Sequence, residues 1–175
     1  MRLNSRTLSV IAALAIVATP VMAEPPALQT PAPVIYLTDN LDEVDRLGWC
    51  IDTLGRGFAE NLQAHSCKPQ GGDVQFSFDG DSGLIRSVEF ADYCMEFVPD
   101  AEPVFALGTC APDNPRQQFV YDTATEAISP ADDPALCVTV GAESRAAGPF
   151  MSRDLLMVSC AETDPVLRSW TFLGG

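Results

Sequence analysis

The sequence predicts an all-β protein built from three copies of one structural unit. The first observation is a repeat, in which a pair of cysteines is followed by a pair of aromatic residues. The first cysteines are Cys50, Cys94 and Cys137, and the leading aromatics are Phe76, Phe119 and Trp170. A period of 43 to 51 residues indicates a supersecondary unit that is stable only when its copies bury their apolar faces together. The second observation is that 14 prolines and the lack of long helical periodicity beyond the N-terminus leave little room for helices.

The N-terminal segment, residues 1–23, has the features of a signal peptide. Arg2 and Arg6 precede a mostly apolar run at 8–18, and small residues lead to a cleavage site after Ala23. The run is too short to span a bilayer, so we expect cleavage, export to the periplasm or the extracellular space, and no stable membrane anchor. The rest of the chain is long enough for one domain with its own core.

The charge is strongly negative. The whole chain has 10 basic and 24 acidic residues and a net charge of −14. Residues 1–23 hold two arginines and no acidic residue, so their removal leaves a net charge of −16. Such a surface repels phosphate backbones and anionic lipid, which argues against a nucleic-acid partner. The negative charge favours solubility, but it does not by itself identify a binding partner.

The elements follow in order along the chain. Residues 24–33 carry four prolines and are expected to form an extended lead-in rather than part of a domain. Residues 35–37 predict the opening strand. Residues 38–48 are expected to hold one short helix, because Thr38 is a suitable N-cap, acidic residues follow it, and Gly48 suits the C-terminal end.

Beyond residue 48 the pattern is one of short strands and turns. Alternating segments predict strands at 50–54, 76–78, 94–97, 119–121, 137–140 and 170–172. Alternation places the two aromatics of each closing strand on one face. The acidic, glycine-containing segment 79–83 predicts a turn before a strand at 84–86. The third copy is longer, and we expect its insertion to be a loop over residues 141–153.

Six cysteines in an exported chain of this size argue for three disulfides. Six cysteines alone allow 15 pairings. If each copy is one unit, the bridges are Cys50–Cys67, Cys94–Cys110 and Cys137–Cys160. A zinc site is not expected, because no C-x-x-C occurs and there is only one histidine. The acidic turn at 79–81 lacks the distal ligands that calcium needs, so we predict no metal and no cofactor.

The closing element of each copy points to a family. The elements are Val74-Gln75-Phe76-Ser77-Phe78, Gln117-Gln118-Phe119-Val120-Tyr121 and Arg168-Ser169-Trp170-Thr171-Phe172. Together with the cysteine pairs they resemble the Q-x-W-x-F-like elements of ricin B-type (R-type) lectin domains, which are β-trefoils. Only the second copy keeps the glutamine and only the third keeps the tryptophan. The resemblance covers residues 34–175 and implies twelve strands, six in a short barrel and six in three capping hairpins, with the closing aromatics in a shared core.

The resemblance also implies a sugar site in the first copy. R-type lectins place an aspartate two residues after the first cysteine, and here this is Asp52. They place an aromatic ring two residues before the second cysteine and an amide two residues earlier, here His65 and Gln63. Asp52 would accept two sugar hydroxyls, His65 would offer its ring face, and Gln63 and Asp73 would orient the ligand. The structural alternative is that Asp52 caps a turn and His65 is an ordinary surface residue.

The other copies keep little of this pattern. The second has Glu96, Gly108 and Arg116 at the corresponding positions, and the third has Thr139, Leu156, Val158 and Leu167. We therefore expect one site at most.

Two functions follow from these residues. The first is a secreted or periplasmic carbohydrate-binding, lectin-like module whose partner is a carbohydrate or a glycoconjugate. The alternative is a β-trefoil scaffold that has lost sugar binding and contacts or inhibits an envelope or extracellular protein, for which Phe150 and Met151 in the insertion are a candidate contact. Catalysis is not expected. Ser82 of the protease-like segment 80–83 lies only 17 residues after His65 along the sequence, in a chain too short for a two-barrel protease.

Overall fold

The computed structural model describes residues 24–55 and 57–174. The predicted signal peptide, residues 1–23, lies outside the described residues. Within the described part of the chain, no helix is both long enough and apolar enough to cross a membrane.

Strands and short 3-10 helices make up the described chain. The strands are β1 (Val34–Leu37), β2 (Trp49–Thr53), β3 (Leu62–Ser66), β4 (Phe76–Asp79), β5 (Leu84–Ser87), β6 (Tyr93–Phe97), β7 (Phe105–Thr109), β8 (Phe119–Asp122), β9 (Ala127–Pro130), β10 (Leu136–Val140), β11 (Arg145–Ala147), β12 (Phe150–Arg153), β13 (Leu155–Ser159) and β14 (Trp170–Leu173). The 3-10 helices are η1 (Gly72–Val74), η2 (Pro115–Gln117), η3 (Cys160–Glu162) and η4 (Pro165–Leu167). The all-β prediction is confirmed.

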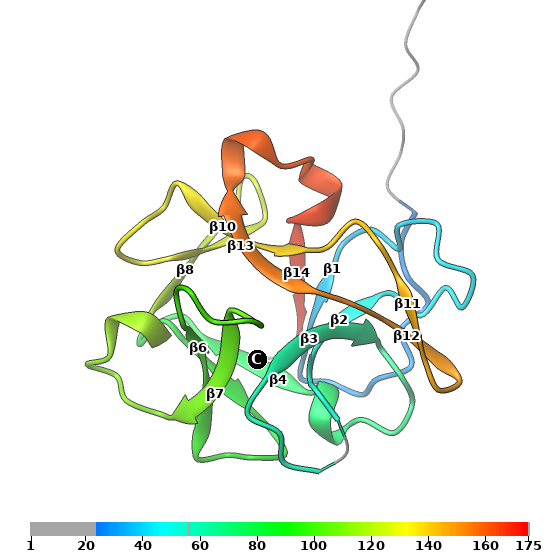
Figure 1. Ribbon diagram of the computed structural model, residues 1–175, viewed down its shortest axis with the longest axis horizontal. Helices are drawn as coiled ribbons and strands as arrows, with labels where there is room; N and C mark the ends of the chain where they lie inside the picture. The colour runs from blue at the N-terminus through cyan, green and yellow to red at the C-terminus, as the bar shows by residue number, and fades with distance from the viewer. Residues whose placement is uncertain (1–23, 56, 175) are drawn as a thin grey trace, which may run out of the picture.

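The strands form three similar lobes around one centre (Figure 1). The first repeat consists of β1 to β4, the second of β5 to β8, and the third of β9, β10, β13 and β14. The outer strands of each repeat pair with those of its neighbours, as β1 with β14, β4 with β5 and β8 with β9. The inner strands form the hairpins β2–β3, β6–β7 and β10–β13. This is the predicted β-trefoil, with β11 and β12 added to its twelve strands.

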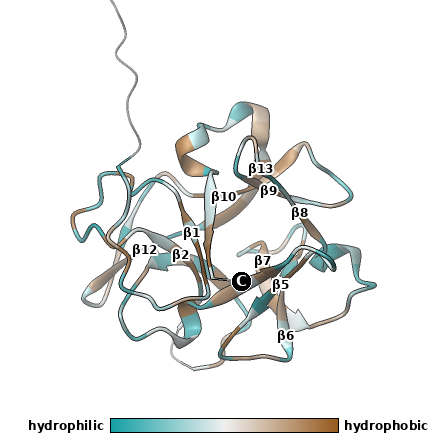
Figure 2. Cartoon of the chain, turned by 180° about the vertical axis from the view of Figure 1, so that it is seen from behind, coloured by the Kyte–Doolittle hydropathy of each residue, from teal (hydrophilic) through white to brown (hydrophobic). Residues whose placement is uncertain are grey.

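The closing aromatics build the core. The leading residue of each closing strand is at most 1 % exposed, and all three belong to one apolar cluster: Phe76, Phe119 and Trp170. The second aromatics are half-buried and contact one another across the repeats. The Phe172 ring centre lies 5.3 Å from that of Phe78 and 4.5 Å from that of Tyr121. Hydrophobic residues accordingly follow the strands, whereas the connecting loops are mostly hydrophilic (Figure 2).

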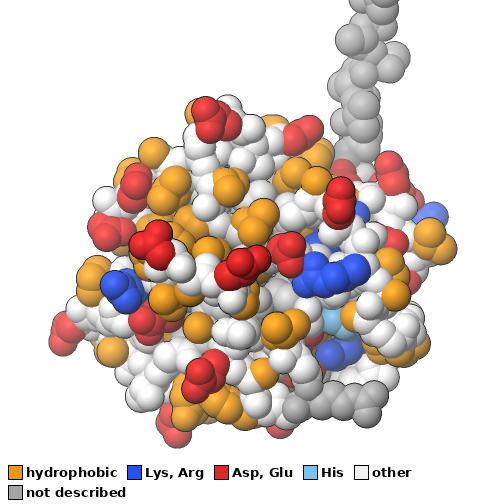
Figure 3. All heavy atoms as spheres, viewed as in Figure 1, with side chains coloured by type: hydrophobic (Ala, Val, Ile, Leu, Met, Phe, Trp, Pro, Cys, Tyr) orange, Lys and Arg blue, Asp and Glu red, His pale blue; other side chains and the backbone are white. Residues whose placement is uncertain are grey.

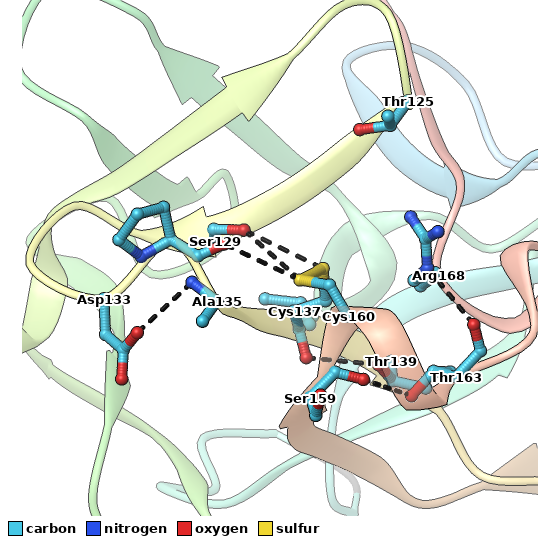
Figure 4. Close-up of a disulfide and its surroundings, with 12 residues drawn as sticks. Thr125, Ser129, Asp133, Ala135, Cys137, Thr139, Ser159, Cys160, Thr163 and Arg168 are labelled. Atoms are coloured by element: carbon cyan, nitrogen blue, oxygen red, sulfur yellow. Dashed lines mark hydrogen bonds between the residues drawn. A yellow bond between two sulfur atoms is a disulfide. The ribbon is translucent and has the colours of Figure 1, made fainter.

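One disulfide closes each repeat, as predicted. The bridges join Cys50 to Cys67, Cys94 to Cys110 and Cys137 to Cys160. Each ties the start of a hairpin to the chain that leaves it. Figure 4 shows the third bridge, where Cys137 and Cys160 meet beside Ser129.

The helix predicted for residues 38–48 is wrong, because the segment is a series of turns. Three of its residues have left-handed backbone angles that a helix excludes: Leu41, Asp42 and Arg46. The side chains of Asp39 and Asp45 accept hydrogen bonds from backbone N–H groups two residues ahead, at 2.6 and 3.0 Å. Such bonds compete with helical ones. The Trp49 indole N–H then donates to the Asn40 carbonyl at 3.1 Å and fixes the loop against the core.

The lead-in, residues 24–33, contains no strand or helix among its described residues, but it is attached to the first repeat. The Gln29 N–H donates to the Cys67 carbonyl at 3.1 Å, and the Thr30 hydroxyl donates to the Lys68 carbonyl at 2.9 Å. The lead-in therefore supports the segment that follows β3.

The insertion in the third repeat is a hairpin, and the prediction of a loop over residues 141–153 is wrong. β11 pairs with β12 around a two-residue turn in which Gly148 has a φ of 67°. Glycine at the first turn position is typical of such tight hairpins. β12 also pairs with β3, so the hairpin lies beside the first repeat rather than its own (Figure 1).

Candidate functional site

The three capping hairpins share one register and differ in their side chains. The first cysteine of each hairpin stands opposite His65, Gly108 and Val158 in turn. The residue two positions further on stands opposite Gln63, Ala106 and Leu156. The positions of Asp52, Gln63 and His65 therefore lie on the same side of the hairpin in every repeat. Only the first hairpin has a polar side chain at all three positions.

A cavity of about 530 Å³ lies beside the first hairpin. The structure brings all four predicted site residues to its wall: Asp52, Gln63, His65 and Asp73. Lys68 adds a cationic group, and the tip of the inserted hairpin, residues 147–150, forms part of the wall. Acidic side chains are scattered over the face shown in Figure 3, whereas basic side chains flank the pale blue of the single histidine.

Asp52 is the most deeply placed polar group of the cavity. Its side chain comes from β2 and is 1 % exposed. One carboxylate oxygen, Oδ2, accepts a hydrogen bond from the Gln63 amide at 3.1 Å. The other, Oδ1, is buried and has no hydrogen-bond partner among the described residues, with Lys68 Nζ 3.8 Å away. An unsatisfied buried carboxylate oxygen is costly, and a ligand hydroxyl can relieve that cost.

Burial raises the pKa of Asp52 from 3.8 to about 7. The nearby Lys68 ammonium opposes this rise, and the negative charge of Asp73 adds to it. The Gln63 amide and the Thr53 backbone N–H also oppose the rise. Asp52 lies within strand β2 rather than in a turn, so it does not act as a turn cap. Strongly perturbed groups that line a cavity are candidates for function.

Lys68 links the two carboxylates of the cavity. Its Nζ donates to Asp73 Oδ2 at 3.0 Å, in addition to facing Asp52. It is the only lysine in the sequence and directly follows Cys67. The sequence analysis missed Lys68. The signal that could have found it is that the only lysine of the chain directly follows the second cysteine of the first repeat.

His65 is buried, at 6 % exposure, and is not an ordinary surface residue. Its Nδ1–H donates to the Ser66 carbonyl at 3.0 Å, which leaves Nε2 as an acceptor. Burial lowers the pKa of His65, so the ring is neutral at neutral pH. The ring centre lies 5.8 Å from that of Phe150, with the planes 63° apart. The small exposed area of the imidazole leaves little ring face for a ligand.

The second repeat has filled its equivalent position with its own side chains. Gln117 Nε2 donates to Glu96 Oε2 at 3.0 Å, directly above Gly108. A side chain at Gly108 would clash with both of them. The Glu96 and Gln117 side chains thus occupy the space that a side chain opposite Cys94 would need.

The third repeat is closed as well. The Thr139 hydroxyl, at the position equivalent to Asp52, donates to the Cys137 carbonyl at 3.1 Å (Figure 4). Apolar Leu156 and Val158 stand across from it on β13. This arrangement offers no carboxylate to a sugar hydroxyl, and Thr139 is only 3 % exposed.

A larger hollow of about 780 Å³ beside the turn after β4 lacks comparable chemistry. Its Asp79 carboxylate already accepts from the Ser82 hydroxyl at 2.7 Å and from the Asp81 N–H at 3.1 Å. The predicted turn is thus present, and its Asp79 carboxylate is already paired within it. Among residues 24–55 and 57–174 there is no group of three or more histidine, cysteine or acidic side chains that could hold a metal ion.

The comparison with protein families decides the identity of the domain. The model of the ricin-type β-trefoil lectin domain matches residues 41–168. The chain belongs to this family. A search of curated protein sequences found no match.

Solved structures share the fold of this ricin-type domain at low sequence identity. The C-half of an earthworm R-type lectin, in complex with GalNAc, has a TM-score of 0.55 at 14% identity and covers 81% of this chain and 98% of its own. The β-trefoil lectin of the Vibrio vulnificus hemolysin/cytolysin, with N-acetyl-D-lactosamine bound, has a TM-score of 0.54 at 15% identity, covering 80% and 91%. The cytolethal distending toxin of Actinobacillus actinomycetemcomitans has a TM-score of 0.55 at 14% identity, covering 80% and 90%.

Proposed function

We propose that the protein is an exported carbohydrate-binding module whose single site is the cavity of the first repeat. The observation that carries the proposal is the buried, unpartnered Oδ1 of Asp52 at the wall of that cavity. Membership of a lectin family supports a carbohydrate as the ligand class.

The polar groups of the cavity match the hydrogen-bonding needs of a sugar. A hydroxyl donates and accepts at once, so one hydroxyl can donate to Asp52 Oδ1 and accept from Lys68 Nζ. A neighbouring hydroxyl can donate to His65 Nε2 or accept from the Gln63 amide. The first of these hydroxyls would satisfy Asp52 Oδ1, which has no hydrogen-bond partner among the described residues.

Export is part of the proposal. The N-terminal segment has the charge and hydropathy pattern of a signal peptide, and three disulfides suit an oxidising compartment. We propose a binding role without catalysis. One shallow site binds weakly on its own, so clustered ligands would raise its effective affinity.

The proposal is tested by replacing Asp52 with alanine. The mature protein is screened on a broad glycan array and against GalNAc and N-acetyllactosamine, and the affinity of each ligand is measured by isothermal titration calorimetry. Loss of the hydrogen bond that Asp52 Oδ1 would accept from the sugar should weaken binding roughly 10- to 100-fold in Asp52→Ala. Glu96→Ala, which removes the acidic side chain at the equivalent position of the second repeat, is the matched control and should bind as the native protein does. If the native protein bound no glycan on the array, the proposal would be rejected.

A second candidate function is a protein-contact scaffold, favoured by two observations. The equivalent positions of the second and third repeats are closed, and the inserted hairpin has no counterpart in the other repeats. Affinity capture from an envelope extract separates the two functions, because a protein partner would stay bound in excess free sugar.

A further inference from the structure

The inserted hairpin of the third repeat belongs spatially to the first repeat. β12 pairs with β3 through Ser152 opposite His65 and Arg153 opposite Ala64. β3 also carries Gln63 and His65 of the candidate site. The hairpin therefore continues the sheet on which the site is built.

Buried polar contacts hold the hairpin in this place. Arg153 is 6 % exposed, and its guanidinium donates to the carbonyls of Gly141 and Ala142 at 3.1 and 2.6 Å. The same guanidinium lies 4.5 Å from the ring centre of Trp49 and 3.5 Å from the Glu43 carboxylate. A cation over an aromatic face adds attraction in a desolvated setting. The base of the hairpin is thus anchored in the core of the first repeat.

A further bond fixes the residue next to the tip. The Met151 N–H donates to the Ser66 hydroxyl at 2.9 Å, and the Met151 side chain packs against the main core. Phe150, one residue earlier, is half-buried and contributes to the cavity wall. Its ring rests against His65 at a ring-centre distance of 5.8 Å. The position of Phe150 is therefore set from both sides.

We propose that Phe150, supplied by the third repeat, is the ring on which the sugar of the first repeat stacks. The inference rests on the proposed function and adds a specificity-determining residue to it. His65 is almost completely buried and supports the Phe150 ring, whereas Phe150 is half-buried and lines the same cavity as Asp52. A sugar with one apolar face can then place its hydroxyls on Asp52, Gln63 and Lys68 and its C–H groups on Phe150.

Substitutions at Phe150 test this inference, with GalNAc and N-acetyllactosamine as the probes. Phe150→Ala should weaken binding about tenfold, because it removes the stacking surface but none of the hydrogen bonds. Phe150→Tyr keeps the ring and should stay within roughly twofold of the native affinity. Phe150→Leu keeps apolar volume without a ring and should lie between the two. Phe58→Ala, which removes a half-exposed ring elsewhere, is the matched control.

Nuclear Overhauser effects provide a second measurement that a purely structural role would not produce. Cross-peaks between the Phe150 ring protons and the sugar C–H protons are expected in the native complex. Native affinity in Phe150→Ala, together with lost binding in Asp52→Ala, would overturn the role of Phe150 and leave the proposed function intact. No binding by the native protein would reject both. Equal losses in Phe150→Ala and Phe150→Tyr would also overturn stacking.

Discussion

Trp170→Ala should lower the free energy of unfolding by about 5 kcal/mol, the upper range for truncation of a buried tryptophan. Trp170 is fully buried in the shared core and lies on β14, which pairs with β1 to join the third repeat to the first. Its indole N–H donates to the Val138 carbonyl at 2.8 Å. The variant loses the ring volume and leaves that carbonyl without its donor, and both losses add to the cost.

Trp170→Phe separates volume from hydrogen bonding. Phenylalanine stands at the two equivalent positions, Phe76 and Phe119, so the core tolerates this ring in the other repeats. We expect a loss of about 1 to 3 kcal/mol, the cost of one unsatisfied buried group. Guanidinium unfolding followed by tryptophan fluorescence measures both variants, because Trp49 remains as a probe. Equal losses in the two variants would show that filling the shared core contributes little to stability.

Asp52→Asn should stabilise the protein at pH 8 and leave its stability almost unchanged at pH 4. The Asp52 carboxyl has a pKa of 3.8 when unfolded and about 7 when folded. Below pH 4 both states hold the proton, so burial costs little. Between pH 4 and 7 the unfolded state releases the proton and the folded state keeps it, which favours unfolding more and more. Above pH 7 the penalty is complete, about 4 kcal/mol at about 1.4 kcal/mol per pKa unit.

Asparagine has no proton to release and therefore escapes this penalty. Lys68 and Asp73, the charged groups that face Asp52, keep each other as partners in the variant. His65, whose pKa burial lowers, is neutral over the upper part of this pH range. Urea unfolding at pH 4, 6 and 8 measures the effect, with the exposed Asp132→Asn as the control. A stability difference that does not change with pH would contradict the buried, proton-holding state of Asp52. At pH 8, where the Asp52 carboxyl is ionised in the native protein, the same variant should lose sugar affinity because the charged acceptor is gone.

The repeat made most of the fold predictable from the sequence. The same local pattern of a cysteine pair and a closing aromatic pair occurs three times along the chain. Its recurrence therefore indicated the strands, the disulfides and the core residues together. The prediction of a helix over residues 38–48 was wrong because the side chains of Asp39 and Asp45 accept hydrogen bonds from the backbone two residues ahead. These bonds resemble those of a helix N-cap, but here they stabilise turns.

The candidate site was predictable only where it follows the repeat. Asp52, Gln63 and His65 occupy fixed positions relative to the cysteines, and the shared hairpin register brings them together. Phe150 lies 85 residues after His65, and nothing local in the sequence indicates that β12 pairs with β3. The partnership of Lys68 depends on where its long side chain points, which the sequence pattern does not encode.

The magnetic resonance signal of the single histidine tests the central claim most directly. His65 is the only histidine in the sequence, so an untagged protein gives one resolvable Hε1 resonance at the wall of the cavity. During titration with GalNAc or N-acetyllactosamine, this resonance should shift to saturation with the dissociation constant found by calorimetry, and it should move little at the same sugar concentrations in Asp52→Ala. A sugar that binds the native protein without moving the His65 resonance would place the site elsewhere and contradict the account.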